Sequence, residues 1–90
     1  MKEALKEFIK QQIVVDTRSS WIYIGVLENV LDGALELSEA DVHENKDTAS
    51  TKDVYVNESR KTGGIANRDR VFINLDFVVS FSPLEDVKNF

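Results

Sequence analysis

"VFINLDFVVSFSPL", residues 71–84, contains few side chains that favour contact with water. The chain around it is polar, since 30% of its 90 residues are charged. The run predicts two short strands, about 70–74 and 77–81, which end at Ser82-Pro83 because proline cannot donate a hydrogen bond to a neighbouring strand. Both faces of these strands are apolar, so each must be covered, either by the chain's own core or by a second copy of the chain.

An exposed apolar edge strand promotes aggregation unless it is paired. One solution pairs this edge with a second copy of the chain, and repeating the head-to-tail contact closes a ring. The apolar residues of the subunit interface would then be Val71, Phe72, Ile73, Phe77, Val78, Val79 and Phe81. The alternative is a monomeric small barrel of the SH3-like sort, whose own core covers both strands.

The first part of the chain predicts one short amphipathic helix. Leu5, Phe8 and Ile9 recur at helical spacing within residues 2–12, and charged side chains take the other faces. A helix of this length is marginal alone in water, so we expect it to pack on an apolar surface. No further helix is predicted after Gln12.

Three more strands are predicted next, at about 13–18, 21–30 and 34–42. Gly25, inside the second of them, is typical of a sharp bend or a close backbone approach. The apolar alternation slips near Glu28-Asn29, which indicates a bulge or strong coiling, and it changes phase again at Ala40. Asp32-Gly33 supplies a hairpin turn signal.

Residues 45–64 form a polar insertion, which predicts a loop to residue 53, a strand extension over 54–61 and a turn at 62–64. We expect one domain, 1–90, with the helix at about 2–12, a barrel at about 13–84 and a short C-terminal tail at 85–90. A helix followed by five short, strongly bent antiparallel strands indicates a mainly β fold, a small barrel with the helix at one open end.

Composition excludes several classes of site. The chain has no cysteine, which excludes disulfides and thiolate metal sites. No nucleophile–base–acid set can be named, so we expect no enzyme activity, no cofactor and no metal. The sequence shows no signal region or membrane span, and we expect a soluble cytoplasmic protein. The net charge of −5 argues against a generally basic nucleic-acid surface but leaves room for a local basic patch.

Two stretches carry a resemblance to the Sm and LSm (Sm-like) family. "YIGVLENVLDGALELSEA", residues 23–40, resembles the first Sm motif in its glycine, its apolar positions and its terminal alanine. Residues 71–84 resemble the second, shorter motif. The resemblance spans about residues 3–85 and implies a helix, a five-stranded bent barrel and a homo-oligomeric ring of roughly five to seven subunits joined through the fourth and fifth strands.

The chain resembles a divergent member, with altered RNA-binding motifs. The family clamps one RNA base per subunit between a loop with an aspartate, an aromatic and an asparagine, and a later loop with arginine-glycine. Here residues 31–34 contain neither the aromatic nor the asparagine, and Asn74-Leu75 replaces arginine-glycine. Losing the arginine removes a cation and a flat stacking group.

The resemblance places Asp32 and Asn74 on the loops that meet at the pore, where the Asn74 amide could read a base edge. The alternative is that Asp32 caps a hairpin and Asn74 makes a turn. A second candidate is the basic cluster of Arg60, Lys61, Arg68 and Arg70, which could hold RNA phosphates. Its alternative is a solvated loop that balances nearby acidic residues.

Trp21 and Tyr23 could stack on bases, although alternating strand positions of this kind more often belong to a core or an interface. His43 is predicted to be a surface residue. Two functions follow from the resemblance. The first is a ring that binds single-stranded RNA, rich in uridine or adenosine, as a scaffold or chaperone in RNA metabolism. The second is a protein–protein assembly scaffold that has lost base recognition.

Overall fold

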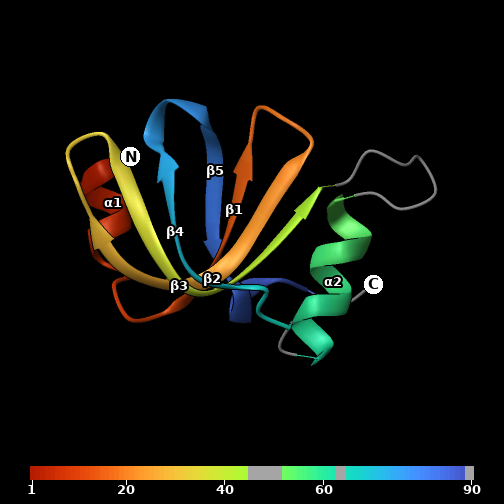
Figure 1. Ribbon diagram of the computed structural model, residues 1–90. Helices are drawn as coiled ribbons and strands as arrows, with labels where there is room; N and C mark the ends of the chain where they lie inside the picture. Colours follow the sequence, from red (N-terminus) through yellow and green to blue (C-terminus); the bar gives the residue numbers. More distant parts are fainter. Residues whose placement is uncertain (45–51, 63–64, 89–90) are drawn as a thin grey trace.

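The computed structural model describes residues 1–44, 52–62 and 65–88 (Figure 1). One antiparallel sheet of five strands runs in the order β4-β3-β2-β1-β5. The elements are α1 Lys2–Lys6, β1 Gln12–Thr17, β2 Trp21–Val30, β3 Ala34–Glu44, α2 Lys52–Thr62, β4 Arg68–Asn74, η1 Leu75–Phe77, β5 Val78–Pro83 and η2 Leu84–Asp86. The predicted mainly β class, with an N-terminal helix and five antiparallel strands, is confirmed. Within the described ranges no helix is long and apolar enough to cross a membrane.

The long strands β2 and β3 bend sharply where Gly25 passes β3. A Cβ atom at Gly25 would lie 2.9 Å from the backbone oxygen of Ser38 and 3.1 Å from the Cα of Ala40. Opposite it, Glu39 adopts a φ of 47° and the strand register shifts. A second shift separates Leu27 from Asn29. The predicted bend and both predicted changes of phase are therefore confirmed.

The bent sheet wraps around an inner core, and α1 covers one of its openings. Leu5 of α1 is fully buried among Leu27, Leu35 and Leu37 of the long strands. The helix ends at Lys6 and not at the predicted residue 12. Beyond it the chain turns so that the backbone N–H groups of Lys10 and Leu27 donate to Leu27 and Gln11 respectively, which draws this segment toward β2.

The outer face of the sheet carries a second apolar cluster, which α2 covers. Val14, Ile22 and Ile24 face outward and pack with Val56 of α2 and Leu84 of η2. The predicted strand extension over 54–61 is therefore wrong, because this segment is helical. Leu84 is 4% exposed, so it belongs to this outer cluster and anchors the start of the C-terminal tail.

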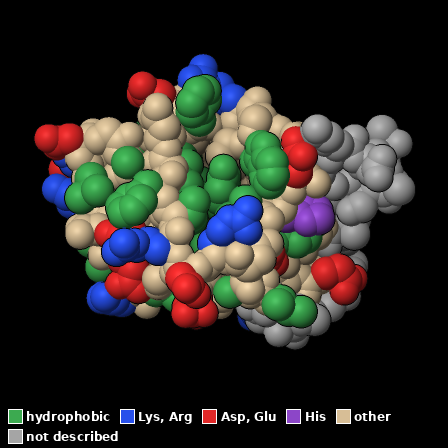
Figure 2. All heavy atoms as spheres, in the orientation of Figure 1, with side chains coloured by type: hydrophobic (Ala, Val, Ile, Leu, Met, Phe, Trp, Pro, Cys, Tyr) green, Lys and Arg blue, Asp and Glu red, His purple; other side chains and the backbone are tan. Residues whose placement is uncertain are grey.

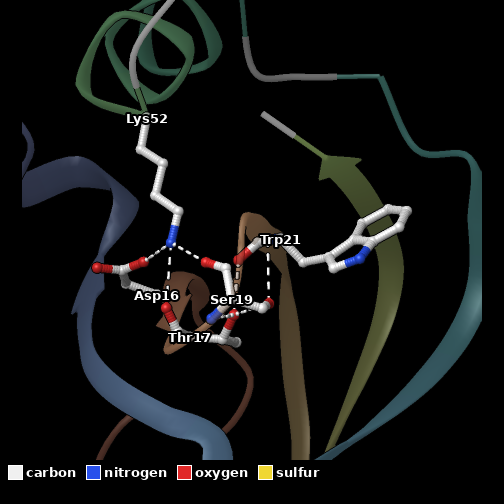
Figure 3. Close-up of polar contacts among 5 residues, drawn as sticks. All are labelled: Asp16, Thr17, Ser19, Trp21 and Lys52. Atoms are coloured by element: carbon white, nitrogen blue, oxygen red, sulfur yellow. Dashed lines mark hydrogen bonds and ion pairs between the residues drawn. The ribbon is translucent and has the colours of Figure 1, made fainter. Parts of the chain in front are cut away.

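Lys52, the first residue of α2, fastens the helix to the turn between β1 and β2 (Figure 3). Its ammonium group donates to the carboxylate of Asp16, to the Thr17 backbone oxygen at 3.1 Å and to the Ser19 backbone oxygen at 2.8 Å. An ammonium has three N–H donors, so these contacts use all of them. The turn is itself fixed, because the Thr17 hydroxyl donates to the Trp21 backbone oxygen at 2.8 Å.

We expect Lys52→Gln to loosen α2 without unfolding the barrel. Hydrogen bonds from a charged group are worth about 1.5–3 kcal/mol when buried, and partial exposure reduces this loss to about 1–2 kcal/mol. Urea denaturation measures the loss, and amide exchange locates it in α2. Lys6→Gln is the matched control, since the ammonium of Lys6 forms an exposed ion pair with Glu3 at 3.4 Å. Equal effects of the two substitutions would contradict this role of Lys52.

Candidate subunit and nucleic-acid interfaces

The two edges of the sheet are β4 and β5. β4 pairs only with β3, and β5 pairs only with β1, so each strand leaves one row of backbone groups unpaired among the described residues. Phe72 of β4 and Val79 of β5 are 54% and 53% exposed, and Phe77, in η1 between the two strands, is 54% exposed. Figure 2 shows hydrophobic side chains gathered over the middle of the face it presents. Exposed apolar edges of this kind are surfaces on which another strand can pair.

Some of the predicted interface residues lie exposed on β4, η1 and β5, and the others pack in or against the inner core. Val71, Val78 and Phe81 are half-buried and pack against the inner core, and Phe81 meets Phe8 edge to face at 5.6 Å between ring centroids. Ile73 is 4% exposed and belongs to the core itself. Its side chain is therefore covered within a single chain, whereas about half of the surface of Phe72, Phe77 and Val79 stays exposed.

The structure brings the loops of Asp32 and Asn74 together. The backbone N–H of Leu75 donates to the Gly33 oxygen at 3.0 Å, and Ala34 pairs with Asn74 in the sheet. The Asn74 side-chain oxygen accepts from the backbone N–H of Asp76 at 2.9 Å and so shapes the turn between β4 and β5.

Asp32 is tied to α1. Its carboxylate accepts a hydrogen bond from the Lys2 ammonium at 2.7 Å. This hydrogen bond and the charge attraction lower the pKa of Asp32 and raise the pKa of Lys2. Because the pKa of the Asp32 carboxyl is lowered in the folded chain, its ion pair with Lys2 is present at neutral pH and is lost as the pH falls through that pKa.

The predicted basic cluster is split between elements. Arg60 lies exposed on α2 and borders a cavity of about 380 Å³ that is lined by Gln11, Gln12, Leu84 and Glu85. Arg68 and Arg70 lie on β4, where Arg70 approaches Glu36 at 3.8 Å and sits 5.5 Å from the centre of the Phe72 ring. In the part of the chain that the structure describes, no contact joins Arg60 to either of them, and the side chain of Lys61 lies outside it.

The aromatic candidates differ in exposure. Trp21 is 36% exposed at the start of β2, whereas Tyr23 is half-buried and packs against the inner core. His43 is half-buried rather than fully exposed, and its ring stacks on Tyr55 of α2 with 4.0 Å between centroids. Contact with α2 explains this difference, because α2 lies beside the end of β3.

Arg18 is a site residue that the sequence does not single out. Its backbone N–H donates to the Phe77 oxygen at 2.9 Å, and its guanidinium donates to the Asp76 oxygen. The guanidinium carbon lies 5.7 Å from the centre of the Phe77 ring. The turn between β1 and β2 therefore meets the turn between β4 and β5, and it brings a cation there.

Comparison with known proteins finds a likeness in structure alone. No protein-family model and no curated protein sequence matches the chain. Among solved structures, the fold is similar to that of the Sm protein of Pyrococcus abyssii, which was determined in complex with a uridine heptamer. The TM-score is 0.60 at 12% sequence identity, over 90% of this chain and 93% of the other.

Proposed function

From this Sm-like fold, we propose that the chain forms a homo-oligomeric ring that binds single-stranded RNA as a scaffold or chaperone. The observation that carries the ring is the pair of edge strands, β4 and β5, on opposite sides of one open sheet, which pair with no further strand among the described residues and which carry the exposed side chains of Phe72 and Val79. When β4 of one copy pairs with β5 of the next, both strands gain a partner. The resulting pair of copies still has one free β4 and one free β5, at its two ends. Successive copies can then close head to tail, as heterologous contacts do.

The support for RNA is chemical and comparative. The similar Sm protein was solved with a uridine heptamer, and a ring repeats every basic group once per subunit. Arg68 and Arg70 of β4 provide such groups, and both lie exposed. Contacts of this kind with phosphates give binding that weakens steeply with salt.

One set of observations favours the second function, a protein–protein assembly scaffold. The carboxylate of Asp32 forms an ion pair with Lys2, and the side-chain oxygen of Asn74 accepts a hydrogen bond within its own turn. The net charge of −5 also opposes RNA at long range. A ring that copurifies with a protein partner and carries no nucleic acid would support this function over the first.

We expect Arg68→Gln combined with Arg70→Gln to weaken binding of a labelled uridine heptamer roughly tenfold at low salt. The loss follows from two missing cations, and the slope of log affinity against log salt should fall by about 0.7 for each phosphate contact removed. Fluorescence anisotropy over a salt series measures both quantities. Lys6→Gln with Lys88→Gln is the control of equal charge. Wild-type affinity and slope in the double arginine variant would exclude these residues from RNA binding.

A further inference from the structure

A cavity of about 220 Å³ opens where the turn between β1 and β2 meets β4 and η1. Its lining residues are Thr17, Ser19, Tyr23, Phe72, Ile73, Asn74 and Phe77. Pockets for drug-sized ligands measure roughly 300–1,000 Å³, so this one suits a single small ring system.

Three of the seven residues that line the cavity are aromatic. Phe77 and Phe72 are each 54% exposed, and Tyr23 is half-buried beside them. Every nucleobase has a π-face, so a base can stack on such rings whatever its sequence context. Phe77 lies in η1, outside the residues of β5, so pairing of strands between copies does not require its ring.

The polar groups of the cavity differ in what they can offer a ligand. The hydroxyls of Thr17 and Ser19 lie 2.8 Å apart and bond to the Trp21 backbone, so they hold the wall in place. The Asn74 amide is oriented by its oxygen, which accepts from Asp76. Its nitrogen makes no hydrogen bond to any residue that the structure describes, and it remains a donor for a carbonyl oxygen.

Arg18 does not line the cavity, but it adds a positive charge next to the lining residue Phe77. Its guanidinium lies over Phe77 and uses one nitrogen to donate to the Asp76 backbone. A guanidinium has five N–H donors, so others remain for a phosphate. Asn74-Leu75 lacks the arginine-glycine expected from the family resemblance, and Arg18 brings a cation to this same turn from another strand pair.

We propose that this cavity is a base-binding site for single-stranded RNA, in which one base stacks on Phe77, Asn74 donates to a base carbonyl and Arg18 holds the adjoining phosphate. The proposal rests on the proposed RNA-binding function. Uracil carries carbonyl oxygens and adenine carries none, so the site favours uridine over adenosine. The base is recognised here by aromatic stacking and one amide donor.

The test compares labelled uridine and adenosine heptamers by fluorescence anisotropy with the full chain. Phe77→Ala should weaken uridine binding by roughly 5- to 100-fold, the range for one stacked base, whereas Phe77→Tyr should retain it. Arg18→Gln should weaken both heptamers more than its matched control of equal charge, Lys6→Gln. Asn74→Asp keeps the oxygen that accepts from Asp76 and removes the donor, so it should abolish the preference for uridine.

Each outcome separates this site from the wider function. If the wild-type chain binds neither heptamer at low salt, the proposed RNA function fails and the site falls with it. If the chain binds RNA but the Phe77 and Arg18 variants bind as tightly as wild type, RNA binds elsewhere and only this site is overturned. If Phe77→Ala lowers the mass of the oligomer, the Phe77 ring takes part in contacts between copies. A second copy then covers the cavity, and the site is again overturned.

Discussion

Val79→Glu should convert the proposed ring into monomers. The Val79 side chain is 53% exposed on β5, a strand that pairs only with β1 among the described residues, so it lies where the neighbouring copy is expected to pair. Assembly would then bury a carboxylate without a partner, which costs about 3 kcal/mol or more at every interface. Sedimentation velocity at micromolar concentration measures the change in mass.

The control for this substitution is Ile65→Glu. Ile65 is 82% exposed and precedes β4. The same change of an apolar side chain to a carboxylate therefore falls outside the strands that are expected to pair between copies. We expect this variant to keep the wild-type mass. Loss of assembly in both variants would point to net charge as the cause, and retention in both would mean that the edge of β5 does not join the copies.

Gly25→Val should destabilise the chain by about 3 kcal/mol or more. Overpacking usually costs about 1–3 kcal/mol, and here the added Cβ would meet backbone atoms of β3, which cannot rotate away as a side chain can. β3 would have to move from β2 at the bend that lets the sheet curl around its core. Thermal and urea unfolding measure the loss.

Gly33→Ala is the matched control. A Cβ at Gly33 would meet no atom within 4 Å, and its φ lies outside the left-handed region. We expect its stability to stay within about 0.5 kcal/mol of wild type, since alanine fits such a site. If the two substitutions lower the free energy of unfolding equally, the close contact of Gly25 with β3 is not what stabilises the bend.

The barrel could be predicted because its signals are local. Gly25 stands alone inside an apolar strand, and the slips near Glu28-Asn29 and at Ala40 appear directly in the alternation of side chains. The same local signals gave the wrong element for α2. Val54, Tyr55 and Val56 favour strands by composition, and the helix gains its stability from packing on the outer face of the sheet.

The candidate site depended more on contacts distant in sequence. Asn74 and Asp32 could be placed on neighbouring loops through the family resemblance, but the Lys2 ammonium that binds Asp32 comes from 30 residues away. Arg18 and Asp76 are separated by 58 residues. Only the pairing of β1 with β5, which shifts register between Asp16 and Thr17, brings that arginine to the last turn. No local pattern encodes such a meeting.

The most direct measurement is native mass spectrometry of the wild-type chain, purified gently and without nuclease. We expect one closed oligomer that carries additional, heterogeneous RNA mass. A closed oligomer without RNA would contradict the RNA function and support the assembly scaffold. A monomer at micromolar concentration would contradict the ring, because the exposed edges of β4 and β5 would then have no partner strand from a second copy.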